Sequence, residues 1–137
     1  MTRDAIATDK LATAVGPFSL GVRGDGLLFL SGQVAQDPAT GRLLDGDTSS
    51  QAEQILRNIA TALEAAGKDL GDVIRVGVYL TDMADFAAMN EVYGKHLAPE
   101  GVVAPARSTV AVAGLPKDAL VEIEVIARDP KGRYGTA

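Results

Sequence analysis

The sequence predicts a single α+β domain in which two helices cover one face of a mixed β-sheet. Apolar residues recur at helical spacing in two segments, and the other apolar segments are short, as buried strands are. In chain order these segments give β-β-α-β-α-β-β, a pattern typical of a two-layer sandwich. A length of 137 residues suits one domain, so residues 1–137 are expected to form it, with a flexible polar tail at 129–137.

The first two strands are expected to form a hairpin after an irregular segment, residues 1–17. A short strand is predicted over residues 19–23, and the pair Asp25-Gly26 is typical of a two-residue hairpin turn. Residues 27–30, Leu-Leu-Phe-Leu, are long enough for a buried strand and too short for a helix. A turn-forming loop is expected at residues 37–41.

The first helix has the strongest signal in the sequence. Ser50 and Glu53 have the spacing of a capping box, S-x-x-E, which indicates a helix N-terminus. Gly67 is expected just beyond the C-terminus of this helix. Its apolar stripe consists of Ala52, Ile55, Leu56, Ile59, Leu63 and Ala66.

A third strand and a second helix follow. Residues 73–80 alternate in the manner of a half-buried strand. Asp82 or Asp85 is expected to cap a helix that continues to Leu97, and Pro99 lies just beyond its end.

The last two strands are expected to fold back on each other as a second hairpin. They are predicted around residues 105–114 and 119–127, with a turn at residues 115–118. Successive side chains of a strand point to opposite faces, so Glu122 and Glu124 share one face with Ile126, opposite the apolar residues Val121, Ile123, Val125 and Ala127.

This hairpin contains the candidate site, which consists of Arg107 on one strand and Glu122 with Glu124 on the other. A guanidinium binds a planar carboxylate through paired hydrogen bonds, and a partly buried carboxylate can accept a proton from water. The structural alternatives are a surface salt bridge for Arg107 and a solvated strand face for the glutamates. The sequence leaves the hairpin register open, so spacing alone does not place Arg107 opposite Glu122 within one chain.

Composition excludes several classes of function. The 18 acidic and 13 basic side chains give a net charge of −5, and no cluster of basic residues could overcome the repulsion of a phosphate backbone, so no nucleic-acid partner is expected. The chain has no cysteine, which excludes disulfides, a thiolate nucleophile and Cys-ligated metals. The single histidine, His96, is expected to be solvated or to cap a helix. The absence of His and Cys at metal-ligand spacing agrees with a protein that needs no metal cofactor.

The sequence also indicates where the protein works and how it assembles. No apolar segment reaches the ~20 residues of a membrane span, and the N-terminus lacks the apolar core of a secretory signal, so a cytoplasmic protein is predicted. Several strands carry apolar residues on both faces, and the chain is too short to supply a third layer. Self-association through the sheet is therefore expected.

Six short motifs occur in an order and spacing that resemble the RidA (YjgF-type) family. They are Gly16-Pro17-Phe18-Ser19, Ser31-Gly32-Gln33, Gln51 with Asn58, Asn90 with Tyr93, Pro105-Ala106-Arg107 and Glu122-Ile123-Glu124. The resemblance, which extends from about Ala14 to Ala127, implies a chorismate-mutase-like fold and a homotrimer with a central barrel and intersubunit clefts. It also implies hydrolysis of reactive 2-imino or 2-enamino acids, such as 2-aminoacrylate, to 2-keto acids and ammonia, without a cofactor.

The same resemblance implies a role for each candidate site residue. Arg107 is the carboxylate-binding position, and Glu122 orients the attacking water and acts as general base. Ser31-Gly32 matches the loop whose backbone faces the ligand. Asn90 matches a helix residue near the cleft, and Thr109 stands where cysteine is frequent. Glu124 is expected to be structural, because one water needs one base.

Two positions depart from the family pattern. Phe18, at a substrate-binding position, replaces the usual tyrosine, and Leu20 replaces a common glutamine. These changes are compatible with a bulkier or more apolar substrate, a slower enzyme or another reaction. The alternative functions are therefore a non-catalytic, small-carboxylate-binding or regulatory trimer and, less favoured because of the acidic charge, an endoribonuclease or translation inhibitor.

Overall fold

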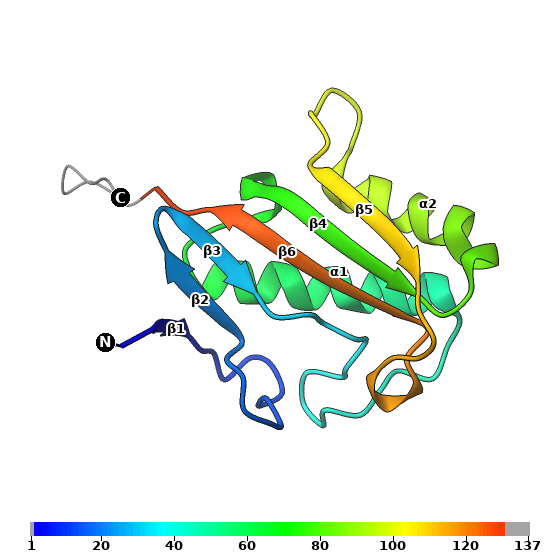
Figure 1. Ribbon diagram of the computed structural model, residues 1–137, viewed down its shortest axis with the longest axis horizontal. Coiled ribbons are helices and arrows are strands. Elements are labelled where there is room, and N and C mark those ends of the chain that lie inside the picture. Colours follow the sequence, from blue (N-terminus) through cyan, green and yellow to red (C-terminus); the bar gives the residue numbers. More distant parts are fainter. Residues whose placement is uncertain (1, 131–137) are drawn as a thin grey trace.

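A six-stranded mixed sheet with two helices on one face forms the protein, as Figure 1 shows for the computed structural model, which describes residues 2–130. The predicted α+β class is confirmed. The strands are β1 (Asp4–Ile6), β2 (Gly21–Gly24), β3 (Leu27–Leu30), β4 (Val73–Leu80), β5 (Ala106–Ala111) and β6 (Val121–Arg128), and the helices are α1 (Thr48–Ala65) and α2 (Phe86–Leu97). Their order in the sheet is β1-β2-β3-β6-β4-β5.

The N-terminal segment contains a strand that the sequence did not predict. β1 pairs antiparallel with β2, with Ile6 opposite Gly21. Ile6 is the one buried residue of this three-residue strand, so there is too little alternation to reveal it. The expected hairpin of β2 and β3 is confirmed, and Asp25 (φ 53°) and Gly26 (φ 77°) adopt the left-handed conformations that its turn requires.

The N-cap of the first helix lies three residues before the predicted cap. Asp47 is the N-cap, and its carboxylate accepts a hydrogen bond of 2.9 Å from Ser50 N. The predicted cap at Ser50 was therefore wrong, because the sequence offered two acceptable capping side chains three residues apart. Gly67 follows the helix with φ 77°, as expected.

The second helix ends at Leu97, as predicted, and a single 3-10 turn, η2 (Met83–Asp85), precedes it. Asp82 caps this turn by accepting a hydrogen bond from Ala84 N. The Asp85 carboxylate instead accepts a hydrogen bond of 2.7 Å from the hydroxyl of Thr48 at the start of α1. Neither predicted side chain therefore caps α2: Asp82 caps the preceding turn, and Asp85 stands at the N-cap position of α2 without a side-chain capping bond.

The predicted closing hairpin was wrong, because β4 lies between β5 and β6. β5 runs parallel to β4 and β6 runs antiparallel to it. The turn signal at residues 115–118 marks the 3-10 turn η3 (Pro116–Asp118) within a wider connection. Turn residues predict where a chain reverses direction but not which strand the next segment pairs with. In this sheet β4 pairs with β5 on one edge and with β6 on the other.

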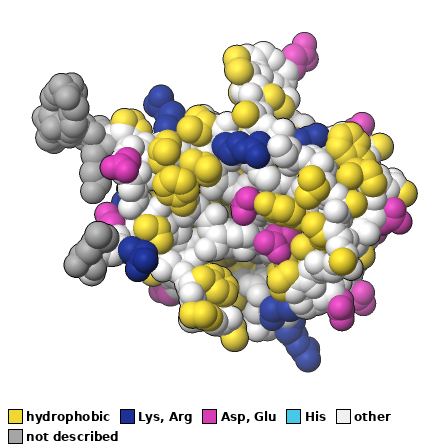
Figure 2. Space-filling model, viewed as in Figure 1, with side chains coloured by type: hydrophobic (Ala, Val, Ile, Leu, Met, Phe, Trp, Pro, Cys, Tyr) yellow, Lys and Arg dark blue, Asp and Glu magenta, His cyan; other side chains and the backbone are white. Residues whose placement is uncertain are grey.

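The two faces of the sheet differ in what covers them. Every second residue of β6, from Val121 to Ala127, is buried against the helices, whereas Glu122, Glu124 and Ile126 point to the other face. This second face, called the open face below, leaves Phe29 of β3 44% exposed. Figure 2 views the molecule from the strand side, where hydrophobic atoms surround acidic groups. In residues 2–130 no helix has both the length and the apolar character to cross a membrane.

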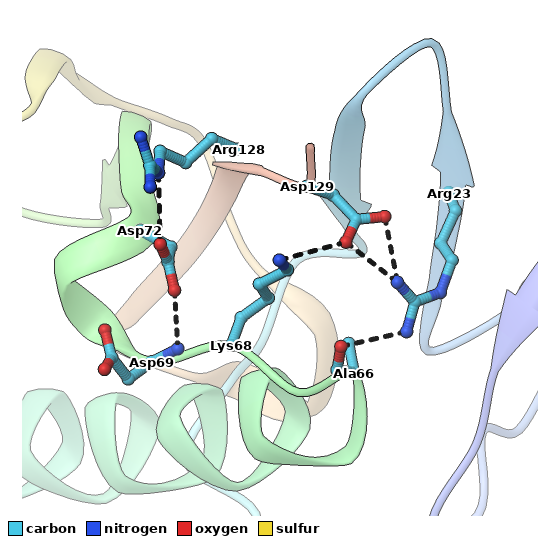
Figure 3. A network of polar contacts seen from close by, with 7 residues as sticks. All are labelled: Arg23, Ala66, Lys68, Asp69, Asp72, Arg128 and Asp129. Atoms are coloured by element: carbon cyan, nitrogen blue, oxygen red, sulfur yellow. Dashed lines mark hydrogen bonds and ion pairs between the residues drawn. The ribbon is translucent and has the colours of Figure 1, made fainter. Parts of the chain in front are cut away.

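The expected flexible tail does not begin at residue 129. Asp129 is buried, and its carboxylate lies 2.8 Å from Arg23 Nη1 and 3.3 Å from Lys68 Nζ. Figure 3 shows the carboxylate between these two cations. Burial alone would raise the pKa of Asp129, but the hydrogen bonds and charges of these partners hold it below its ordinary value. Arg23 also donates to the carbonyl oxygen of Ala66 at the end of α1. The rest of the predicted tail, residues 131–137, lies outside the described residues.

Candidate functional site

Glu122 and Glu124 lie on the open face of β6. In the ladder with β4, Glu122 is opposite Tyr79 and Glu124 is opposite Gly77. The Tyr79 hydroxyl donates a hydrogen bond of 2.7 Å to Glu124 Oε2. A Cβ atom at Gly77 would lie only 2.9 Å from the same oxygen, so the absence of a side chain there lets the Glu124 carboxylate lie across β4.

The loop after β3 approaches β6 closely at Glu122. Gln33 N donates to Ile123 O at 2.9 Å, and Ile123 N donates to Gln33 O at 3.0 Å. This bridge places Gly32 against the Glu122 side chain, and a Cβ atom at position 32 would collide with Glu122 Oε2. The close approach expected at Gly32 is therefore an approach to the candidate base.

Ser31 connects this loop to the N-terminal segment. Its hydroxyl donates a hydrogen bond of 2.6 Å to Ser19 O, and its backbone N donates one of 3.0 Å to Leu20 O. These two bonds hold the segment that contains Phe18 beside the loop that contains Gly32.

A cavity of about 610 Å³ opens beside Glu122. The N-terminal segment 11–20, the loop 31–38 and the connection at residues 116–117 contribute walls, and β6 contributes Glu122 and Glu124. Of the predicted site residues, the structure places these four around the cavity: Phe18, Ser31, Gly32 and Glu122.

The environment of Glu122 changes its proton affinity. Burial raises the pKa of the Glu122 carboxyl above its ordinary value of 4.5, and the negative charge of Glu124 raises it further. A carboxylate with a raised pKa is a stronger base than an exposed one, and it retains a captured proton at higher pH. Glu122 is therefore suited to move a proton to and from a molecule in the cavity.

Arg107 lies on the opposite face of the sheet, against α2. It is opposite the buried Val76 in the parallel ladder with β4, so its side chain points to the helix side. Its Nη1 donates a hydrogen bond of 2.8 Å to Asn90 Oδ1. Its Cζ lies 4.6 Å from the ring centroid of Tyr93 and 5.5 Å from that of Phe86. Three side chains of one helix face thus hold the guanidinium in place.

Two buried hydroxyls accompany Arg107. Thr109 is two residues further along β5 and shares the helix-side face with Arg107. Among residues 2–130, the Thr109 and Tyr93 hydroxyls are the buried side-chain polar atoms without a hydrogen-bond partner. Buried polar atoms are usually paired, so both are available to a bound molecule or water.

The predicted site residues therefore form two groups in one chain. Arg107, Asn90 and Thr109 lie on the helix side of the edge strand and on α2. The other group, with Glu122, lines the cavity on the open face. The predicted hairpin does not exist, and the Arg107 and Glu122 side chains leave the sheet on opposite faces.

Sequence reasoning missed several contributors to these groups. Phe86 lies four residues before the predicted Asn90 and Tyr93 lies three residues after it, so helical periodicity could have shown that both share its face. Lys117, which lines the cavity, had no such signal: its Nζ donates to Gly41 O at 3.1 Å across two loops.

His96 has a different role from the predicted one. Its Nε2 lies 2.9 Å from Glu53 Oε1, so it connects α2 to α1 and does not only face solvent. Among the described residues, no group of three or more acidic or histidine side chains is placed to hold a metal ion.

Known proteins share the sequence and the fold of this chain. Residues 8–129 match the model of a family described as Endoribonuclease L-PSP. A Salmonella typhimurium protein named 2-iminobutanoate/2-iminopropanoate deaminase is 42% identical over 122 residues, which are 89% of this chain and 94% of the relative.

Two solved structures share the architecture. RidA from the Antarctic bacterium Psychrobacter sp. superposes with a TM-score of 0.84 at 45% identity, over 92% of this chain and 99% of the other. E. coli TdcF with bound serine also gives a TM-score of 0.84, at 40% identity over 91% and 98%. Fold and sequence thus define a small α+β domain of the kind found in these structures. The chain belongs to the RidA (YjgF-type) family, whose model carries the description Endoribonuclease L-PSP.

Proposed function

We propose that the protein hydrolyses 2-imino acids to 2-keto acids and ammonia, in a cleft formed by Arg107 of one copy and the Glu122 cavity of another. The observation that carries the proposal is the half-buried Glu122 carboxylate, which is fixed against Gly32 at the edge of a cavity. The name of the Salmonella relative, 2-iminobutanoate/2-iminopropanoate deaminase, supports the reaction class.

The separation of the two groups supports a shared cleft. One chain carries Arg107 and Glu122 on opposite faces, so a substrate that touches both needs two chains. The open face retains exposed apolar side chains, including Phe29 at 44% and Val110 at 46% exposure, which a second copy could cover. A closed homotrimer, as the family resemblance implies, gives each cleft the same composition.

Arg107 binds the substrate carboxylate in this proposal. Asn90 Oδ1 accepts a hydrogen bond from one of the five N–H groups of Arg107, and the rings of Tyr93 and Phe86 restrict the plane of the guanidinium. A guanidinium that is already oriented loses little conformational entropy when it forms two parallel hydrogen bonds to a carboxylate. The unpaired hydroxyl of Thr109 is available beside it.

Glu122 moves the protons of the hydrolysis. The carboxylate takes a proton from water as the water oxygen bonds to the carbon of the protonated imine, which gives a carbinolamine. The same proton then passes to the amino nitrogen. Loss of the hydroxyl proton to Glu122 accompanies cleavage of the C–N bond, and ammonia leaves as ammonium after recovering that proton. One water is consumed, and R–C(=NH₂⁺)–COO⁻ becomes R–CO–COO⁻ and NH₄⁺.

The test is keto-acid release from an imine that an amino-acid oxidase generates in situ. Arg107→Ala should lower kcat/KM by about 10²- to 10³-fold, because charge-assisted hydrogen bonds to the carboxylate are lost. Glu122→Gln should lower it about 10²- to 10⁴-fold, which is the usual contribution of a general base. Arg57→Ala and Glu64→Gln, at exposed ion pairs on α1, are the matched controls. An Arg107→Ala protein with full activity would refute the proposed anchor.

A second candidate is a binding protein without catalysis, which the bound serine in E. coli TdcF favours. Calorimetric binding of serine or 2-ketobutyrate that depends on Arg107, combined with no rate effect on any imine, would establish this candidate instead. RNA cleavage, which the family description suggests, would be established only if it disappeared in Glu122→Gln.

A further inference from the structure

Two carboxylates of β6 line the cavity, and they lean toward opposite edges of that strand. The Glu122 carboxylate lies against the loop after β3, where a Cβ atom at Gly32 would collide with its Oε2. The Glu124 carboxylate lies across β4, on the other edge of β6, and a Cβ atom at Gly77 would stand 2.9 Å from its Oε2. The proposed hydrolysis uses only one of these two carboxylates as its base.

The hydroxyl of Tyr79 fixes the direction in which Glu124 leans. Tyr79 is opposite Glu122 in the ladder between β4 and β6, yet its hydroxyl donates a hydrogen bond of 2.7 Å to Glu124 Oε2. Within residues 2–130, this is the only hydrogen bond that the Glu124 side chain makes. A glutamate side chain has several staggered rotamers, so one short bond decides which of them the carboxylate occupies.

The neighbouring cations do not share this role. Arg75, on the same face of β4 as Tyr79, donates from its Nη2 to Ser108 Oγ on β5 at 3.2 Å. Lys117 lines the cavity, but its Nζ donates to a backbone carbonyl of the loop 37–41. In the part of the chain that the structure describes, neither glutamate takes part in an ion pair. Their separation is therefore what limits their mutual repulsion.

We propose that Tyr79 is a positioning residue for the hydrolysis, whose hydroxyl holds Glu124 over Gly77 and thereby leaves Glu122 as the free base. This inference rests on the proposed imine hydrolysis and adds a residue to it. Two carboxylates about 3 Å apart share one proton, because like charges at that distance cannot both ionise. A Glu122 carboxylate that shares a proton with Glu124 cannot take another from water.

A phenol is suited to this task because it keeps its proton. The hydrogen bond to Glu124 raises the pKa of Tyr79 above its ordinary value of 10.0, and burial raises it further. The hydroxyl therefore remains a donor to Glu124 throughout the neutral pH range.

The test is the pH profile of Tyr79→Phe, a variant that loses one oxygen atom and keeps the ring. Without this donor, the pair of glutamates retains its first proton to higher pH, because the bond that favoured the fully charged pair is gone. The fall of kcat/KM on the acid side should therefore move to higher pH. At the pH where the wild type has lost half of its activity, the variant should be at least about twofold less active. Above the fall, the two proteins should have the same activity.

A second substitution shows whether the effect passes through Glu124. In a Glu124→Gln protein there is no second carboxylate to share a proton, so adding Tyr79→Phe should leave the acid fall where Glu124→Gln alone places it. Thr61→Ala, which removes a hydroxyl that donates to Arg57 O on α1, is the matched control and should not change the profile. The carboxyl ¹³C resonance of Glu122, assigned by its absence from Glu122→Gln, follows the same titration without any imine.

The outcomes separate this inference from the function beneath it. A Tyr79→Phe profile that coincides with that of the wild type would overturn the role of the hydroxyl while leaving imine hydrolysis in place. An equal movement with and without the Glu124 carboxylate would overturn the route through Glu124. A wild-type protein that accelerates no imine would overturn the proposed function, and with it the role of Tyr79 in the reaction. The ¹³C titration would then still show whether the hydroxyl keeps the two carboxylates apart.

Discussion

Two inactive variants, Arg107→Ala and Glu122→Gln, should restore each other's activity when their chains assemble together. In one chain, Arg107 is level with Val76 and Glu122 is level with Tyr79, with β4 between their strands. Two strand spacings of about 4.8 Å and three rises of about 3.3 Å place their Cα atoms roughly 14 Å apart, with side chains on opposite faces. An imino acid has its carboxylate bonded directly to the reacting carbon, so one chain cannot serve both groups.

The magnitude of the recovery follows from the composition of each cleft. An active cleft takes its arginine from a Glu122→Gln chain and its glutamate from an Arg107→Ala chain. If f is the fraction of Arg107→Ala chains and assembly is random, the active fraction is f(1 − f), which peaks at about a quarter of the wild-type activity in an equal mixture. This result holds for any closed ring in which each cleft joins two neighbours.

The assay is refolding of the mixed chains from denaturant, followed by measurement of keto-acid release, with mass spectrometry to verify mixed assemblies. The control mixes wild-type chains with the double variant Arg107→Ala/Glu122→Gln. If f is now the fraction of double-variant chains, clefts shared by two chains retain (1 − f)² of the activity, about a quarter in an equal mixture. Sites within one chain would retain about half. Absence of recovery at every ratio, in verified mixed assemblies, would refute the shared cleft.

Three further predictions concern the surroundings of the site and the fold. Gly32→Ala should lower kcat/KM about 10-fold or more by displacing the Glu122 carboxylate, whereas Gly24→Ala, where a Cβ atom meets nothing within 4 Å, should not; equal activities of the two variants would contradict the argument. The plot of activity against pH should fall on its acid side as Glu122 becomes protonated, at a pH above 4.5. Glu124→Gln should move this fall to lower pH because it removes a like charge. A fall at the same pH in both proteins would exclude an influence of Glu124 on Glu122. Asp129→Asn should cost about 3 kcal/mol of unfolding free energy at pH 7 because two partly buried cations lose their partner. Because the pKa of Asp129 is lowered in the folded state, this contribution is complete well above the ordinary value of 3.8 and is lost progressively as the pH falls through the lower folded-state pKa, so urea unfolding should show a larger difference at pH 7 than at pH 3.

Local chemistry made part of the fold predictable. The Asp25-Gly26 turn fixes the β2–β3 hairpin, because the pair tolerates the left-handed conformations that such a turn needs. The apolar stripe of α1 is buried as its periodicity indicated. Helix capping was less certain, because Asp47 and Ser50 are both good caps and only the folded chain shows which one the helix uses.

Strand order was not predictable in the same way. Pairing of β4 with both β5 and β6 depends on contacts between segments that are distant in sequence, and a turn signal near residues 115–118 carries no information about them. The position of Arg107 relative to Glu122 was left open for the same reason, because the register of the strands was not predictable. Arg107 and Asn90 were both expected in the site, and they meet at 2.8 Å, but neither meets Glu122 within the chain.

The wrong hairpin and the divided site have one physical cause, the insertion of β4. β4 separates β5 from β6, and their register on it sends Arg107 to the helix side and Glu122 to the open face. The same register buries Val121 and Ile123, so a slip by one residue would move both glutamates into the core and the valine out of it. The hydrophobic core therefore fixes the face from which Glu122 projects, and the proposed cleft takes its arginine from a second copy because Arg107 lies on the other face.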